Sequence, residues 1–143
     1  MFRLFLDTSS IVGSILPDDE DNKYPMAILL QNKVPLVTNE YVVKELRCVL
    51  PKFLENFEIN KFIDFIYAKF LVLKTPSKNE CRKIRCKDRA DSPIIATALK
   101  ENCVLVTEDT RLREDASEYV VVLSSQETVT VLGFGLATKK KNW

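Results

Sequence analysis

The sequence contains no histidine, and this absence excludes more chemistry than any residue that is present. Ser-His-Asp and Cys-His catalysis, HExxH metal sites and histidine general bases all require an imidazole. Any catalysis must therefore use carboxylates, hydroxyls, cations or a bound metal ion. The 4 cysteines include no Cys-x-x-Cys pair, so the sequence gives little support to a zinc site.

Long apolar runs and a secretory signal are also missing. No run approaches the roughly 18–20 residues needed to cross a membrane. The apolar start reaches Asp7 too soon for a signal peptide, so we expect a cytoplasmic protein with reduced thiols and no membrane partner. The net charge is only +1, so the overall balance does not indicate a nucleic-acid partner.

A chain of 143 residues with 46% hydrophobic residues suits one compact domain with a substantial core. Short apolar runs predict strands at residues 4–6, 34–37, 71–74, 103–106 and 119–123. Apolar stripes and capping residues predict helices at 8–17, 24–32, 39–50, 53–69, 77–86 and 92–100, with a short helix or strand at 126–132. This alternation predicts a three-layer α/β/α fold with a mainly parallel central sheet.

The stretch from residue 88 to 112 combines a helix that begins on an acid with a buried strand that is followed by another acid. Ser92 and Pro93 mark the helix start, because proline in the first turn gives up no needed N–H. Asp91 heads the apolar face of that helix. Asp109 follows the strand in a loop past its carboxyl end, where open α/β sheets keep their ligand sites.

Two further acids have comparable positions. Asp7 directly follows the first predicted strand, on the same rim of the sheet as Asp109. Glu45 is spaced i−3 and i+4 from Val42 and Val49, so its carboxylate should lie at the edge of a buried helix face. Each acid has a plain alternative as a helix cap, a turn former or a surface charge. Grouped carboxylates need a neutralising cation, and oxygen ligands without histidine or thiolate favour Mg²⁺ or Mn²⁺.

Four motifs in this order resemble the PIN domain family. They are Leu-Asp7-Thr-Ser, Val-Val-Lys-Glu45-Leu, Asp88-Arg-Ala-Asp91-Ser-Pro-Ile-Ile-Ala-Thr-Ala and Leu-Val-Thr107-Glu-Asp109-Thr-Arg-Leu. The resemblance extends from residue 4 to about residue 123. It implies a single PIN-like nuclease domain, expected over residues 1–138, followed by a basic tail at 139–143. The implied activity is that of a metal-dependent ribonuclease of RNA processing, RNA decay or toxin–antitoxin type.

The resemblance also implies roles for individual residues. Catalytic and metal-binding roles fall on Asp7, Glu45, Asp91 and Asp109, and Asp88 is an extra acid that could join the metal shell. Supporting roles fall on Thr8 and Thr107. The implied cofactor is Mg²⁺ or Mn²⁺. The expected partners are RNA, an antitoxin or a processing-complex protein, and a second copy of the chain in a homodimer.

Basic residues concentrate just before the central acids. Residues 74–89 carry a net charge of +5, which leaves −4 for the rest of a chain whose total is +1. Helical spacing predicts that four of these cations form one stripe, which we expect to bind RNA backbone: Lys78, Arg82, Arg85 and Arg89. A solvated helix face is the plain alternative.

Two other functional classes remain open. An aspartyl-nucleophile phosphatase or phosphotransferase needs Asp-x-Asp after the first strand, and Ser9 occupies the second of those positions. A non-catalytic RNA-binding or scaffold protein on a PIN-like fold is the more serious alternative. The presence of all four acids argues against it. An assay of Mn²⁺-dependent RNA cleavage would separate these classes.

Overall fold

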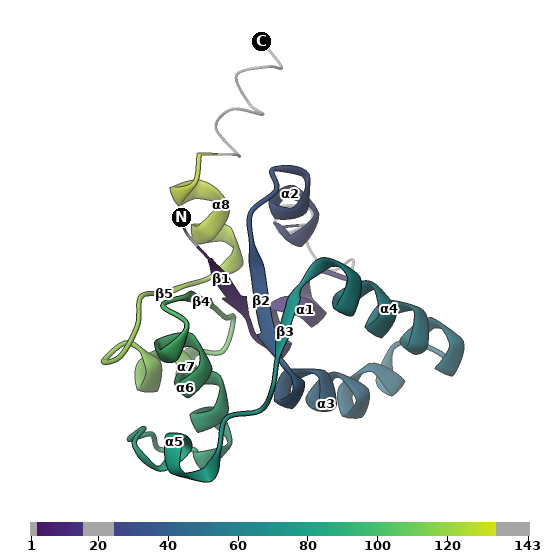
Figure 1. The fold of residues 1–143 in the computed structure, drawn as a ribbon. Helices are drawn as coiled ribbons and strands as arrows, with labels where there is room; N and C mark the ends of the chain where they lie inside the picture. The colour runs from purple at the N-terminus through teal and green to yellow at the C-terminus, as the bar shows by residue number, and fades with distance from the viewer. Residues whose placement is uncertain (1–2, 16–24, 134–143) are drawn as a thin grey trace.

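The computed structural model describes residues 3–15 and 25–133, and within them strands alternate with helices (Figure 1). The strands are β1 (Leu4–Leu6), β2 (Leu36–Asn39), β3 (Leu71–Leu73), β4 (Val104–Val106) and β5 (Val122–Leu123). They form one sheet in the order β3-β2-β1-β4-β5, and all pairs are parallel. The predicted α/β fold with a parallel central sheet is confirmed.

Helices connect the strands. They are α1 (Thr8–Gly13), α2 (Pro25–Gln31), α3 (Glu40–Val49), α4 (Asn56–Lys69), α5 (Lys78–Arg82), α6 (Ser92–Lys100), α7 (Thr110–Ala116) and α8 (Ser125–Val131), with 3₁₀ helices η2 (Leu50–Lys52) and η3 (Arg89–Asp91). Side chains of the central strand β1 point alternately to the two faces, yet every one is buried. Both faces of the sheet are therefore covered, as a three-layer fold requires.

Buried apolar side chains hold three helices of the site, α3, α6 and α7, against the sheet. Leu46 of α3, Ile95 of α6 and Leu112 of α7 are each at most 1% exposed. Burying a side chain of this size stabilises the fold by roughly 1.5–3 kcal/mol. Burial of these three side chains holds α3, α6 and α7 against the sheet. It thereby also positions Glu45 on α3, Asp91 before α6 and Asp109 before α7.

The carboxyl ends of the central strands meet at one rim. Leu6 pairs with Val106 in the β1–β4 register, and the Asp7 amide donates to the Val106 carbonyl at 3.3 Å. The neighbouring strand β2 ends at Asn39, whose side chain accepts from the Val42 amide and so caps α3. Asp7, Asn39 and Thr107 thus end or follow three adjacent strands.

Several predicted boundaries are wrong. The first helix ends at Gly13, the helix expected over 77–86 ends at Arg82, and α7 was not predicted. The fifth strand is shorter than predicted. The predicted tail at 139–143 and the predicted domain end at 138 lie outside the described residues. None of the described helices is long and apolar enough to span a membrane.

Candidate active site

Five acids from four separate segments line one pocket of about 440 Å³ at the carboxyl-end rim: the four that the sequence singled out and Glu108, which directly precedes Asp109. Asp7 follows β1, Glu45 lies on α3, Asp91 ends η3 and Asp109 precedes α7. The structure therefore brings together the four acids that the sequence singled out. The predicted supporting residue Thr8 lines the same pocket. The other one, Thr107, is buried and donates to Asp7.

Asp7 is the most buried of these acids, at 3% exposure. Its Oδ1 accepts from the Ser10 amide at 3.0 Å, which caps α1, and its Oδ2 accepts from the Thr107 hydroxyl at 2.5 Å. Burial raises the pKa of Asp7, and these hydrogen bonds oppose that shift. Asp7 is thus a helix cap and a pocket acid at once.

Glu45 lies where its spacing predicted, at the edge of the buried face of α3. The Thr8 hydroxyl donates to its Oε1 at 2.9 Å. Burial raises the pKa of Glu45, the Thr8 hydrogen bond lowers it, and the nearby charges of Asp7 and Asp88 raise it again. Thr8 therefore supports the ionised form of Glu45 and fixes its orientation in the pocket.

Asp91 differs from Asp7 and Asp109 in how its carboxylate is bonded. Its side chain makes no capping bond to α6 and belongs to no ion pair of the described ranges. Burial raises the pKa of Asp91 to about 6, with further contributions from the charges of Asp88 and Asp109. Asp91 thus occupies the N-cap position of α6 without a capping hydrogen bond from its carboxylate.

Asp109 precedes α7 and caps it. Its Oδ1 accepts from the amides of Arg111 at 2.9 Å and Leu112 at 3.3 Å. The Asp109 amide donates to the Thr107 hydroxyl oxygen at 3.0 Å, and that hydroxyl in turn donates to Asp7. Thr107 thus couples the positions of Asp7 and Asp109, which supports its predicted auxiliary role.

Asn39 has a second role that its sequence position did not reveal. Its side-chain amide donates to the Thr97 hydroxyl oxygen at 2.8 Å and to the Pro93 carbonyl at 3.2 Å. Because Asn39 also caps α3, this buried side chain joins α3 to α6. It thereby sets the position of Glu45 relative to Asp91. A cap signal in the sequence cannot disclose a bond to a residue 58 positions away.

Ser9 and Tyr41 are further residues that the sequence reasoning missed. Ser9 lines the pocket, and its hydroxyl lies 2.9 Å from Asp7 Oδ1 and accepts from the Glu108 amide at 3.0 Å. The hydroxyl-rich run after Asp7 was the available signal for it. Burial raises the pKa of Tyr41, in the first turn of α3, and the charges of Glu45 and Asp88 raise it further.

The donor chemistry of the pocket fits a divalent cation. No lysine or arginine is among the described residues that line it. Burial raises the pKa values of Asp7, Glu45 and Asp91, and the charges of neighbouring acids raise those of Glu45 and Asp91 further. A cation would favour the ionised forms. Oxygen donors suit Mg²⁺ or Mn²⁺. Among residues 3–15 and 25–133, however, no three acidic or thiol side chains form a preformed metal cluster.

The predicted basic stripe does not lie on one helix. α5 ends at Arg82, Arg85 lies in the loop that follows, and Arg89 begins η3. The reason is Ile84, which is 2% exposed, because the chain turns after α5 to place this side chain in the core. The exposed cations of this region are Lys78, Arg82, Lys83, Arg85, Lys87 and Arg89.

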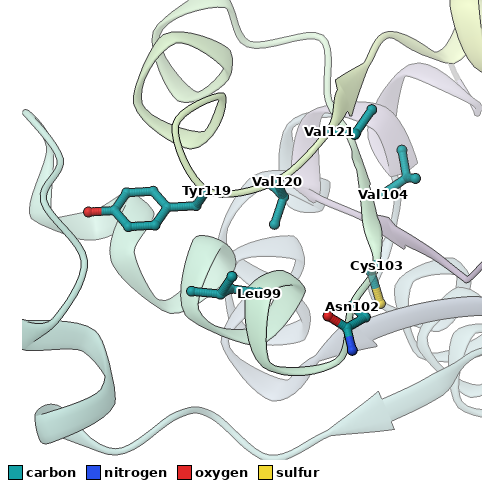
Figure 2. A pocket seen from close by; sticks show the side chains of 7 residues that line it. All are labelled: Leu99, Asn102, Cys103, Val104, Tyr119, Val120 and Val121. Carbon is teal, nitrogen blue, oxygen red and sulfur yellow. The ribbon is translucent and has the colours of Figure 1, made fainter.

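A second pocket lies at the amino end of β4, away from the acids (Figure 2). Its volume is about 610 Å³, and its lining is mainly apolar: Leu99, Asn102, Cys103, Val104, Tyr119, Val120 and Val121. It contains no carboxylate and no cation. Although it is larger, it offers no group for the chemistry that the acid pocket can support.

The sequence model of the PIN domain family matches residues 3–111, a span that includes all five acids that line the pocket. The chain belongs to the PIN domain family. The fold of this PIN domain is also that of VapBC2 from Rickettsia felis bound to a promoter DNA fragment, at 16% identity over 86% of this chain and 98% of that one, with a TM-score of 0.67.

Two further solved structures share the fold of this PIN domain. DNA-bound VapBC from Salmonella typhimurium has 17% identity over 87% of this chain and 99% of that chain, with a TM-score of 0.68. The PIN domain endonuclease Utp24 has 16% identity over 85% and 84%, with a TM-score of 0.57. Comparison with curated protein sequences gave no match.

Proposed function

We propose that this PIN domain is a metal-dependent ribonuclease that hydrolyses RNA phosphodiester bonds. The observation that carries the proposal is a single pocket lined by five acids from four chain segments, the four predicted ones and Glu108, with no lysine or arginine among the described residues that line it. Membership of the PIN domain family supports a nuclease. The likeness in fold to an endonuclease, Utp24, supports it as well.

The acids act mainly as ligands in this proposal. Asp7, Glu45, Asp91 and Asp109 would hold Mg²⁺ or Mn²⁺, and Asp88 lies close enough to raise the pKa of Asp91 by its charge. The bound ion supplies Lewis acidity toward water and the phosphodiester. Thr8 and Thr107 hold the carboxylates of Glu45 and Asp7 by hydrogen bonds, so these oxygens are oriented before any ion binds.

RNA is the proposed substrate because exposed cations accompany the acids. Lys78, Arg82 and Arg85 lie on α5 and in the loop after it, which leads directly into Asp88 and Asp91. A phosphate backbone approaching an acidic pocket needs positive charge nearby to offset repulsion. We propose these three side chains as backbone contacts.

We also propose a protein partner of the antitoxin or processing-complex kind. The support is the fold shared with the chains of two VapBC structures solved on DNA. A homodimer remains a prediction from the sequence. Light scattering of the purified chain measures it directly, and a monomer at assay concentration would contradict it.

The decisive experiment is cleavage of single-stranded and structured RNA by the purified protein with Mn²⁺ or with excess chelator. We expect cleavage only with the metal. Asp7→Asn, which keeps the shape of the side chain and removes its charge, should lower the rate at least about 100-fold. Full activity in chelator would refute the metal-dependent mechanism. RNA binding without cleavage under all conditions would favour the non-catalytic alternative.

A further inference from the structure

The loop between α5 and η3, residues 83–88, is fastened to the body of the domain on one side by α7 and the turn after it. We call this segment the basic loop. The Tyr119 hydroxyl oxygen accepts from the Arg85 amide at 2.8 Å. The Asp115 carboxylate accepts from the Lys87 amide at 2.9 Å. Two backbone groups of the loop are thus bound to elements that follow Asp109 in the chain.

On its other side the basic loop is held by Arg89. The guanidinium Nη1 donates to the Ile84 carbonyl at 2.6 Å and Nη2 donates to the Cys81 carbonyl at 2.8 Å. Both carbonyls lie where α5 ends. The Cys81 carbonyl also accepts from the backbone amides of Lys83 and Ile84, so Arg89 adds a side-chain donor there. The planar guanidinium of arginine donates to both carbonyls through two nitrogens, whereas lysine has only one nitrogen to donate from.

Arg89 also lies between Asp88 and Asp91 in the chain. Its carbonyl accepts from the Ser92 hydroxyl at 2.7 Å, and the Asp91 amide donates to the Asp88 carbonyl at 3.0 Å. The carboxylate of Asp91 makes no capping bond of its own. Its place in the pocket is therefore set by the backbone around it, which Arg89 ties to the end of α5.

We propose that Arg89 is a positioning residue of the candidate active site and not a contact for the RNA backbone. Its guanidinium holds the basic loop, and this fixes the backbone that presents Asp91 to the pocket. The inference rests on the proposed function for its effect on metal binding and cleavage. It replaces the sequence-based prediction that Arg89 continues a phosphate-binding stripe.

The test uses Arg89→Lys, which keeps the positive charge and loses the fork. We expect Mn²⁺ affinity, measured by calorimetry, to fall on the order of tenfold, as for other residues that orient metal ligands. Amide hydrogen exchange at Arg85 and Lys87 should become faster in the metal-free protein. If Arg89 were a phosphate contact, lysine would replace it with little loss in either measurement.

A second variant, Arg89→Gln, removes the charge. Since Arg89 does not contact phosphate in this proposal, the salt dependence of RNA binding should keep its wild-type slope. A slope reduced by about 0.7 in the log–log plot would identify a lost phosphate contact on single strands and overturn the inference. Tyr119→Phe releases the loop from the opposite side and should also speed exchange at Arg85.

The matched control is Arg47→Lys on the exposed side of α3, which should change none of these quantities. Wild-type Mn²⁺ affinity and exchange rates in Arg89→Lys, beside an active wild-type protein, would overturn only the positioning role. A wild-type protein that neither binds Mn²⁺ nor cleaves RNA would overturn the proposed function and this inference with it.

Discussion

Two groups of carboxylates in this molecule have opposite surroundings. In the α7–α8 contact, formed by Arg113, Ser124 and Glu127, the Glu127 carboxylate binds the Arg113 guanidinium at 2.7 and 3.3 Å. It also accepts from the Ser124 amide at 2.8 Å. The Arg113 hydrogen bonds and this amide lower the pKa of Glu127 to about 2. In the acid pocket, by contrast, the pKa of Asp91 rises to about 6.

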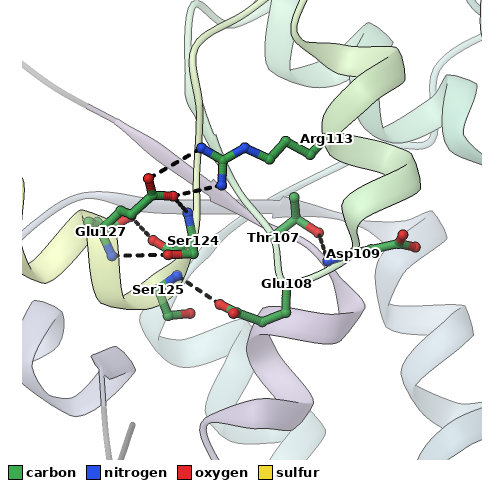
Figure 3. Close-up of polar contacts among 8 residues, drawn as sticks. Thr107, Glu108, Asp109, Arg113, Ser124, Ser125 and Glu127 are labelled. Atoms are coloured by element: carbon green, nitrogen blue, oxygen red, sulfur yellow. Dashed lines mark hydrogen bonds and ion pairs between the residues drawn. The ribbon is translucent and has the colours of Figure 1, made fainter. Parts of the chain in front are cut away.

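Figure 3 shows the α7–α8 contact together with Glu108 and Asp109, two of the acids that line the pocket. Arg113 reaches Glu127, whereas the Asp109 carboxylate points away from that pair. Glu108 also contributes to structure, because its carboxylate accepts from the Ser125 amide at the start of α8 at 2.7 Å. A carboxylate with a cation and amide donors is fully used by the fold. In the part of the chain that the structure describes, no lysine or arginine lines the acid pocket, and this difference suits its carboxylates to binding a metal cation.

The largest effect that tests this comparison is expected from Asp91→Asn. Cleavage should fall on the order of 100-fold because a ligand charge is lost. The stability of the metal-free protein should stay unchanged or rise, since one repelling charge is removed. Single-turnover cleavage and thermal melts with and without Mn²⁺ measure both. Wild-type cleavage by this variant would remove Asp91 from the catalytic set.

Glu127→Gln is the matched control for Asp91→Asn, because it removes one carboxylate charge from the paired environment. It should lower the melting temperature and leave the cleavage rate as in the wild type. The two variants thus give opposite patterns if the comparison is right. Equal loss of stability in both, with cleavage intact, would mean that both acids are structural.

A change in pH is expected to have an intermediate effect on the stability of the metal-free protein. Asp91 has a folded-state pKa of about 6 against an ordinary value of 3.8, so between these values the folded protein binds more protons than the unfolded chain. The metal-free protein should therefore gain stability as the pH falls from 7 to about 5. The raised pKa values of Asp7 and Glu45 act in the same direction.

Glu127 contributes with the opposite sign. Its stabilisation is complete above the ordinary value of 4.5 and is lost as the pH falls from there toward 2. Melts between pH 3 and 8 in chelator should thus show a maximum near pH 5. Saturating Mn²⁺ should remove the gain on acidification, because the metal competes with protons. A metal-free melting temperature that rises from pH 5 to 7 would contradict the assignment.

The smallest effect concerns the cations beside the pocket. Arg82→Ala and Arg85→Ala should each reduce the log–log salt slope of single-stranded RNA binding by about 0.7. Lys61→Ala on α4 is the control, since this exposed lysine lies over the Phe57 ring and not beside the acids. Filter binding over a salt series measures the slopes. Slopes that match the control would leave these arginines as an ordinary solvated surface.

Local patterns in the sequence were sufficient for much of the fold. The apolar runs located all five strands, and the Ser77 and Asn39 caps correctly marked the starts of α5 and α3. The strand-then-acid pattern correctly placed Asp7 and Asp109 at one rim, because parallel strands in register end together. α7 was missed because its residues are mostly charged and its main start signal, Asp109, had been interpreted as a loop acid.

The sequence by itself determined which side chains are available: four acids after strands or on apolar helix faces, no histidine, and a segment rich in cations. Only the tertiary structure decided which of them meet. Asn39 joins α3 to α6 and so brings Glu45 and Asp91 to one pocket, and burial of Ile84 ends α5 so that the exposed Arg89 side chain donates to the Ile84 carbonyl. Helical spacing describes neighbours within one element, whereas these contacts join residues whose proximity depends on how whole elements pack.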